Sequence, residues 1–359
     1  MKLTKKRLVN IFFILGVVAV VVMILTFDVS FVKLWEHIKR AGLWLVPIIG
    51  VWIVIYAMNA VAWRSIINSG QAKSERVGFW YVFKLTISGY ALNYSTPMAG
   101  LGGEPYRVVE LSKRIGNQRA TSSVILYVMT HILAHFGFWF FSVFVYVFLA
   151  LRGDVPGSAV YVCLLVLLLL VCLSAAWLFS RGYKNGMVVK VINFIGKLPG
   201  LKRWSANLLA KHAESLGRID RQIADMHRQD KLTLYGSLSV EFLSRFVQSL
   251  EILFMLLLFG VDNGGGVAGI ALTYVHSVMI VAITSLLSNI IGFLPMQIGV
   301  QEGGFVISIA LLGLEPALGI FVCIICRVRE IFWIIVGLVL MKIEGRKKGE
   351  NQKKNSSRL

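Results

Sequence analysis

Long apolar runs separated by short basic segments dominate the chain. A helix needs about 20 mainly apolar residues to cross the hydrocarbon core of a bilayer. Seven stretches are near or above that length: 9–27, 43–63, 122–151, 158–179, 233–259, 267–294 and 317–341. Two other apolar stretches are weaker candidates for a span. The stretch 79–97 ends in a polar and glycine-rich segment, and the stretch 303–314 is too short. The pattern predicts an all-α, polytopic helical membrane protein with about seven full spans.

The positions of the basic residues predict the orientation. The chain holds 37 Lys and Arg against 18 Asp and Glu, a net charge of +19, and most of the basic residues lie between the apolar runs. That placement is typical of the positive-inside rule and of attraction to anionic lipid head groups, so no nucleic-acid partner is expected. The two termini and the connections 64–77, 104–121 and 180–232 are therefore predicted to be cytoplasmic.

This orientation predicts two segments that enter the membrane and return. Both ends of 79–121 are basic and predicted to be cytoplasmic, so 79–97 should enter and come back. By the same reasoning, 267–314 should start and end on the outer side. The chain is therefore predicted to contain two re-entrant helical hairpins that enter from opposite faces, with tips covered by protein or lining a wet cavity.

The two hairpin tips share a sequence pattern. Residues 97–104 and 295–302 each begin with Pro-Met, contain an interior glycine and end with Glu seven residues after the proline. Broken helices at matching positions of inverted repeats indicate transporter binding sites. Proline frees backbone carbonyls, glycine admits a close neighbour, and Glu suits a helix N-terminus. An inverted internal repeat is predicted, with chance likeness and simple helix caps at Glu104 and Glu302 as alternatives.

Several charged residues lie inside the predicted spans, where burial of a charge is costly. Glu241 and Arg245 are four residues apart, and Arg327 and Glu330 are three apart with Arg329 beside them. One interpretation is a set of internal ion pairs that hold the helices together. The other is a polar cavity in which arginine side chains bind phosphate oxygens through their planar fork.

Other motifs that carry chemistry are sparse. His131 and His135 share a helix face, but the sequence offers no third ligand nearby, so neither a metal nor a cofactor is expected. There is no P-loop, nucleophile elbow or dinucleotide-binding motif. The connection 180–232 is too short for a typical domain and is predicted to form amphipathic helices on an anionic leaflet. We expect one transmembrane domain over 1–343 and a disordered basic tail over 344–359.

Two segments resemble the signatures of a known family. The run 89–93 through Pro97, followed by 103–107, resembles the first signature of the lysylphosphatidylglycerol synthase transmembrane-region family, and 295–302 resembles the second. The likeness extends over roughly residues 8–341. It implies a bacterial plasma-membrane flippase, which in the best-known members moves aminoacylated phosphatidylglycerol between leaflets. Because stand-alone members are linked to other lipid or lipid-linked sugar pathways, the resemblance does not identify the cargo. The chain continues only about 18 residues past its last predicted span, so we expect a stand-alone member without the C-terminal synthase domain.

Three functions are compatible with these patterns. The first is a lipid flippase or transporter for an anionic or aminoacylated phospholipid, or for a lipid-linked head group. The second is an enzyme of lipid head-group modification, similar to a phosphatidylglycerol lysyltransferase, which would use Glu104 with His131 or His135. The third is a scaffold for a partner synthase or glycosyltransferase, and a homo-oligomer is compatible with each.

For the transporter, no catalytic residue is predicted, and the expected ligand is a membrane phospholipid with an anionic head group. The predicted substrate-binding residues are those of the two tips and the buried charges: Asn93, Pro97, Gly103, Glu104, Arg107, Glu241, Arg245, Pro295, Gly299, Glu302, Arg327, Arg329 and Glu330.

Overall fold

The computed structural model describes residues 39–95, 102–185, 188–197, 202–229, 231–290 and 299–356. All regular secondary structure within these residues is helical, which confirms the predicted all-α class. The predicted span 9–27 lies outside the described residues. So do most of the first tip, including Pro97, and the first part of the second tip, including Pro295.

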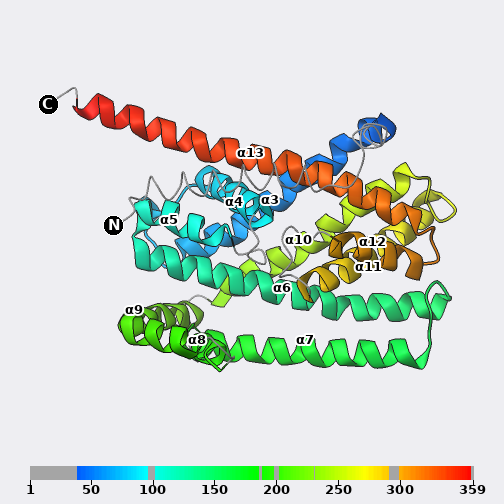
Figure 1. Ribbon diagram of the computed structural model, residues 1–359, viewed down its shortest axis with the longest axis horizontal. Coiled ribbons are helices and arrows are strands. Elements are labelled where there is room, and N and C mark those ends of the chain that lie inside the picture. The colour runs from blue at the N-terminus through cyan, green and yellow to red at the C-terminus, as the bar shows by residue number, and fades with distance from the viewer. Residues whose placement is uncertain are drawn as a thin grey trace.

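Long helices form most of the molecule (Figure 1). Among the described residues, four helical segments are long and apolar enough to cross a membrane: Lys39–Asn68, Asn117–Arg152, Ala159–Gly182 and Gly266–Ile290. They correspond to η1 (Gly42–Trp44) with α3 (Leu45–Asn68), α6 (Asn117–Arg152), α7 (Ala159–Asn185) and α11 (Gly266–Ile290). Two further long helices, α10 (Lys231–Leu258) and α13 (Ala317–Ser356), match two other predicted spans and carry the buried charges.

Three helices are shorter: α4 (Phe79–Ser95), α5 (Glu104–Ile115) and α12 (Val300–Leu311), with the single turn η2 (Lys73–Glu75) preceding α4. At about 1.5 Å per residue, the 12 residues of α5 or α12 extend about 18 Å, well short of a bilayer core. Helices α4 and α5 lie in the half of the molecule that contains α8 and α9, whereas α12 lies with α11 in the opposite half (Figure 1). Because α11 itself is long enough to cross, the count of seven spans and two re-entrant hairpins stays a prediction.

Helices α3 to α6 and helices α10 to α13 have matching neighbours. Helices α3 and α10 pack together and run in opposite directions (Figure 1). Helix α5 packs on α6 as α12 packs on α13, and α4 packs on α13 as α11 packs on α6. This exchange of partners is the packing that the predicted inverted repeat requires. It also places α5 and α12, the two helices that begin near the predicted tips, in corresponding positions.

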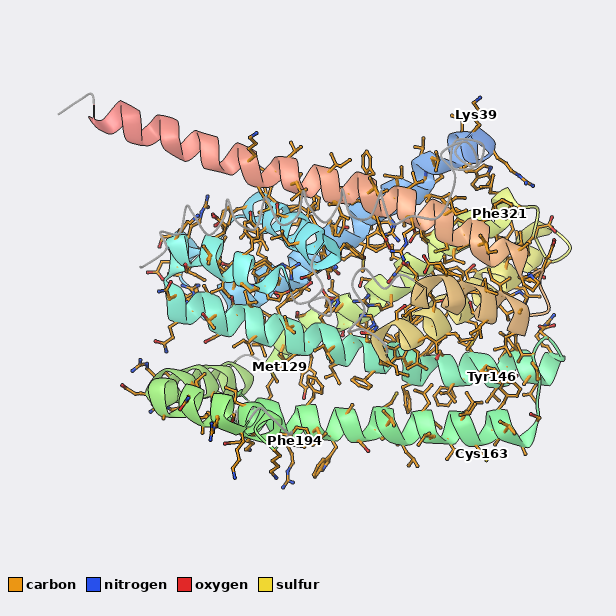
Figure 2. All side chains as sticks on the ribbon, in the orientation of Figure 1. Lys39, Met129, Tyr146, Cys163, Phe194 and Phe321 are labelled. Atoms are coloured by element: carbon orange, nitrogen blue, oxygen red, sulfur yellow. The ribbon has the colours of Figure 1, made fainter. Side chains whose placement is uncertain are left out.

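Helix α7 lies along one edge of the bundle beside α6 (Figure 2). Much of its surface is apolar and exposed, as at Leu164, Leu167 and Leu170. An exposed apolar face of this length suits contact with lipid acyl chains. The charged side chains inside α10 and α13 are buried instead, within a core that is otherwise mainly apolar.

The basic connection contains two helices, α8 (Val188–Ile195) and α9 (Lys202–Gln229), which are joined by a hydrogen bond of 2.8 Å from Ser205 Oγ to the Ile192 carbonyl. At the C-terminus, α13 continues as helix to Ser356, whereas the polar composition of residues 344–359 predicts a disordered tail. Lysine, glutamate and glutamine favour helix, and extending an existing helix is easier than starting a new one.

Candidate functional site

The first cluster of buried charge lies at the start of α5. Arg107 Nη1 donates to Glu104 Oε1 at 2.9 Å, one helical turn away, and Nη2 donates to the Thr86 carbonyl on α4 at 3.3 Å. The Arg107 side chain is only 1% exposed. Its guanidinium carbon lies 4.9–5.6 Å from the ring centroids of three aromatic residues: Tyr90, Trp63 and Tyr127. The positive charge of Arg107 is therefore stabilised both by the ion pair with Glu104 and by the three aromatic rings around it.

Two glycines allow this close packing. A Cβ on Gly89 would lie 2.1 Å from Arg107 Nε, and a Cβ on Gly103 would lie 2.0 Å from the Gly89 carbonyl oxygen. Asn93 closes the junction: its Oδ1 accepts from the Gly103 amide at 2.6 Å, and its Nδ2 donates to Glu104 Oε1 at 3.3 Å. Four of the five predicted site residues of this region, all except Pro97, which lies outside the described residues, therefore meet where the end of α4 contacts the start of α5.

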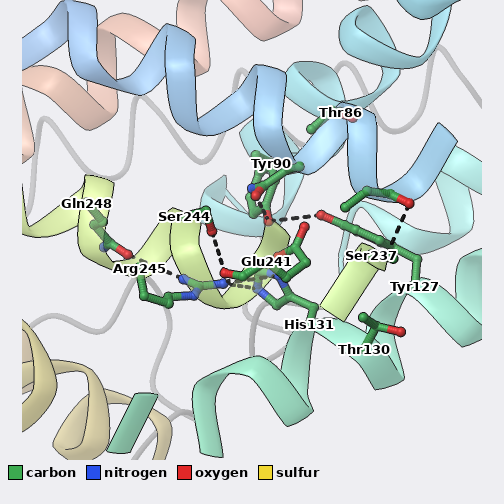
Figure 3. A network of polar contacts seen from close by, with 12 residues as sticks. Thr86, Tyr90, Tyr127, Thr130, His131, Ser237, Glu241, Ser244, Arg245 and Gln248 are labelled. Carbon is green, nitrogen blue, oxygen red and sulfur yellow. Dashed lines mark hydrogen bonds and ion pairs between the residues drawn. The ribbon is translucent and has the colours of Figure 1, made fainter. Parts of the chain in front are cut away.

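A second cluster joins α6 to α10 (Figure 3). His131 Nδ1 lies 2.7 Å from Glu241 Oε2, and Arg245 Nη2 lies 3.8 Å from the same oxygen. Arg245 Nη2 also lies 3.0 Å from His131 Nε2, and its Nη1 donates to Gln248 Oε1 at 3.3 Å. The predicted pair Glu241–Arg245 is present, but His131 is the nearer partner of the carboxylate.

Two tyrosines connect the first cluster to the second. The hydroxyls of Tyr90 and Tyr127 lie 3.5 Å apart, and Asn59 Nδ2 donates to Tyr90 at 3.0 Å. The Tyr127 ring lies 6.0 Å from the ring of His131. Sequence reasoning assigned no role to these tyrosines. The usable signals were the position of Tyr90 inside the motif 89–93 and that of Tyr127 one turn before His131.

A third cluster lies between α12 and α13. Arg327 Nη2 donates to Glu302 Oε1 at 3.0 Å, while its Nη1 donates to Glu330 Oε2 at 2.9 Å. Glu302 also caps its helix, because its Oε2 accepts from the Gly299 amide at 2.6 Å. Gln301 Nε2 donates to Glu330 Oε1 at 3.2 Å. Glu302 is therefore both a helix cap and an ion-pair partner, and its role in substrate binding stays a prediction.

This third cluster continues inward to α10. Arg329 Nε donates to Glu251 Oε1 at 2.8 Å, and the Trp52 indole donates to Glu251 Oε2 at 2.9 Å. The Arg329 guanidinium stacks over the Trp52 ring at 4.0 Å, and its Nη2 lies 3.8 Å from Glu330. Glu251 was missed by sequence reasoning, although a carboxylate inside the predicted span 233–259 was a usable signal. Trp52 had none.

An aromatic layer separates the two halves of this interior. Tyr56 on α3 has its ring centroid 5.0 Å from Trp333, 5.4 Å from Tyr90 and 5.5 Å from Trp52. Tyr90 belongs to the network of the first two clusters, whereas Trp52 contacts the third. The predicted site residues therefore form two groups rather than one, and their separation is filled by aromatic side chains from α3, α4 and α13.

The charges in the three clusters are nearly balanced. They contain four guanidiniums (Arg107, Arg245, Arg327 and Arg329) and five carboxylates (Glu104, Glu241, Glu251, Glu302 and Glu330). Each guanidinium lies within 4.0 Å of a carboxylate. Charged groups buried in this way are stable only when paired and hydrogen-bonded. An incoming ligand would therefore have to exchange with an existing ion pair.

The accessible members are few. Side-chain exposure is 36% for Glu302, 22% for His131, 15% for Glu104 and 11% for Arg245. The first two clusters and the third cluster therefore each contain partly exposed side chains. Within the described parts of the chain, no group of three or more His, Cys, Asp or Glu residues is arranged to hold a metal ion.

Comparison with known families identifies the family to which the chain is related. Its residues 13–338 match the family model of the lysylphosphatidylglycerol synthase TM region. The chain belongs to this family. It is therefore a lipid-related membrane protein, and the first two and the third charge clusters all lie within the matched region. The comparisons with curated proteins and with solved structures find no match.

Proposed function

We propose that this family member is a flippase that moves an anionic or aminoacylated phospholipid of the phosphatidylglycerol type between leaflets. The observation that carries the proposal is the pair of buried, charge-paired groups, each with partly exposed members. A charge inside a bilayer is costly to keep, and intramembrane ionisable residues commonly mark a substrate path. The family's association with a lipid synthase supports a lipid as the ligand.

The ion pairs suggest how a head group is accommodated. In the empty state each arginine is neutralised by a glutamate, so the interior carries little net charge. A phosphate presents two oxygens to the planar fork of Arg107 or Arg327 and takes the place of a carboxylate. The released Glu104 or Glu302 can then bind the ammonium group of an aminoacylated lipid. The acyl chains stay in lipid while the head group exchanges partners.

The enzyme alternative is favoured by one contact. His131 is held by a buried carboxylate, which is an arrangement used by general bases. However, His131 bonds Glu241 and Arg245, whereas Glu104 bonds Arg107 and Asn93. The enzyme alternative requires Glu104 and a histidine to act together, but Glu104 and His131 lie in different clusters. We therefore place transport first and lipid modification second.

A reconstitution experiment tests the proposal. The purified full chain is placed in vesicles of phosphatidylethanolamine and phosphatidylglycerol that contain a fluorescent phosphatidylglycerol, and the loss of probe from each leaflet is followed. We expect faster transbilayer movement than in protein-free vesicles and in vesicles with an unrelated helical membrane protein. Equal rates in all three would overturn the proposal.

Two variants test the residues. Arg107→Ala and Glu302→Gln each remove one member of an ion pair whose carboxylate is partly exposed, and each should slow lipid movement. Arg152→Gln removes the exposed pair Arg152–Asp154 and should not. Wild-type rates in both site variants would refute the residue assignment. Incubation with labelled lipid and aminoacyl-tRNA addresses the alternative, because formation of aminoacylated lipid would favour the enzyme.

A further inference from the structure

Glu241 has an unusual environment for a carboxylate. Its side chain is 0% exposed, and its Oε2 is shared between His131 and Arg245. Its other oxygen, Oε1, is buried without a hydrogen-bond partner among the described residues. A buried carboxylate oxygen that lacks a partner is costly, and protonation removes the charge that makes burial so unfavourable. Glu241 is therefore a buried carboxylate with one oxygen shared between His131 and Arg245 and a second oxygen that can accept a proton.

His131 connects this carboxylate to the accessible interior. Its side chain is 22% exposed, while Glu241 lies behind it at 2.7 Å from Nδ1. An imidazole can take up a proton on one ring nitrogen and pass the other proton on. In this structure Nε2 lies 3.0 Å from Arg245 Nη2. A proton that reaches Nε2 when this contact opens can move through the ring to Glu241 without any further side chain. Figure 3 shows the two side chains directed toward each other between α6 and α10.

We infer that His131 and Glu241 form a proton-binding pair whose protonation frees Arg245 for an anionic head group, so that lipid movement is coupled to proton uptake. This inference rests on the proposed transport function. One proton enters from water, binds the imidazole and passes to the Glu241 carboxylate. Glu241 is then neutral, and the positive charge of Arg245, 3.8 Å away, is no longer compensated. A head group with one negative charge restores the balance, so one proton accompanies each lipid.

Apart from His135, the surrounding groups leave this pair as the titrating element. Arg107 on α5 is already paired with Glu104. Tyr90 on α4 and Tyr127 on α6 lie beside His131, while Tyr56 on α3 contacts Tyr90 and Tyr274 on α11 donates to the Phe246 carbonyl. These tyrosines ordinarily titrate far above neutral pH. Arg329 and Glu330 on α13 are paired with Glu251 and Arg327. His135, whose ring lies 5.1 Å from His131, is the other nearby group that ordinarily titrates near neutrality.

The first test uses a pH gradient in the reconstituted system. Fluorescent phosphatidylglycerol movement is measured in phosphatidylethanolamine–phosphatidylglycerol vesicles at equal pH and with a gradient in each direction. For the wild type we expect a several-fold change in net rate that reverses with the gradient. In Glu241→Gln and His131→Gln the ratio of gradient to no-gradient rates should fall to about one, because no proton can be exchanged. An unchanged ratio in these two variants overturns the inference.

A matched histidine serves as the control. His276 on α11 is also buried, but its Nδ1 contacts the Asn263 side chain at 3.3 Å rather than a carboxylate. His276→Gln should keep the wild-type response to the gradient. Loss of the response in His276→Gln as well would mean that removing any buried histidine abolishes coupling, and would count against the assigned pair.

A second readout is independent of transport. Infrared spectroscopy of the purified protein should show a protonated carboxylic acid band that grows as pH falls and that loses the contribution of one carboxyl group in Glu241→Gln. Persistence of the whole band in Glu241→Gln, or its absence in the wild type, overturns the proton-binding pair. If the wild type shows the band but moves no lipid, the proposed function fails while the proton site stands. If it moves lipid with no response to the gradient, the coupling fails and the proposed function stands.

Discussion

The starts of α5 and α12 carry the same glutamate in the same position after a Pro-Met pair, yet they find their cations differently. Glu104 pairs with Arg107 from its own helix, and that arginine is sealed at 1% exposure in an aromatic cage. Glu302 pairs with Arg327 from α13, caps Gly299 and remains 36% exposed. The first junction is a tight contact between α4 and α5, whereas the second is an accessible joint between α12 and α13.

The difference shows which part of the repeated motif is the same in both halves of the bundle. Both halves place a carboxylate at the start of a 12-residue helix. The compensating arginine comes from whichever element packs nearest, because the electrostatic requirement is only that a cation lies within reach. We expect the stability of the first junction to depend on close packing. We expect the stability of the third cluster to depend on its deeply buried pairs, which lie behind the accessible carboxylate of Glu302. Four measurements test this distinction.

The largest effect is expected at the inner end of the third cluster. Arg329→Met leaves the buried Glu251 without its cation, and breaking such a pair typically costs about 3–5 kcal/mol. Arg107→Met should cost less, because Glu104 is 15% exposed and keeps its bond to Asn93. Unfolding of both variants in one detergent measures the difference. Equal losses would remove the distinction between the deep pair and the junction pair.

The next effect separates two glycines that lie beside the matching glutamates. Gly103→Ala places a Cβ 2.0 Å from the Gly89 carbonyl and should cost about 1–3 kcal/mol, as overpacking does. Gly303→Ala has nothing within 4 Å of the added carbon and lies in a helix, so it should be neutral or stabilise by up to about 1 kcal/mol. Thermal unfolding of the two variants checks this. Similar destabilisation in both would show that the first junction is not tighter.

A smaller effect is the coupling energy of the two glutamate–arginine pairs. Double-mutant cycles with Glu104→Gln and Arg107→Gln should give a coupling of about 0.5–3 kcal/mol that changes little with salt. Cycles with Glu302→Gln and Arg327→Gln should give less than about 1 kcal/mol and weaken as salt is added, because Glu302 is partly exposed. The opposite salt dependence would contradict the assigned difference in accessibility.

The smallest effect on stability is expected for Glu302→Gln alone. The glutamine carbonyl can still accept from the Gly299 amide, and an exposed ion pair contributes little, so the loss should stay below about 1 kcal/mol. Lipid movement should nevertheless slow, since the carboxylate that exchanges with the head group is gone. Normal unfolding with slowed transport would show a functional carboxylate, whereas slowed transport with large destabilisation would indicate a structural one.

The sequence by itself determined the class of the protein. Long apolar runs require helices in a bilayer, because only internal hydrogen bonds satisfy the backbone there. The motif 103–107 marked α5, and the short run 303–314 marked α12, since neither is long enough to span. The spacing of Glu241 and Arg245 also indicated a shared face, and the structure brings both to the same cluster. These inferences depend on local periodicity and composition alone.

The tertiary structure decided which charges meet. Glu302 and Arg327 are 25 residues apart, Glu251 and Arg329 are 78 apart, and His131 and Glu241 are 110 apart. Spacing along a helix says nothing about such pairs, because they depend on how α6, α10, α12 and α13 cross. The separation of the charges into two groups by Tyr56 and its aromatic neighbours is likewise a result of packing. Sequence reasoning found most of the charged residues, and only the fold paired them.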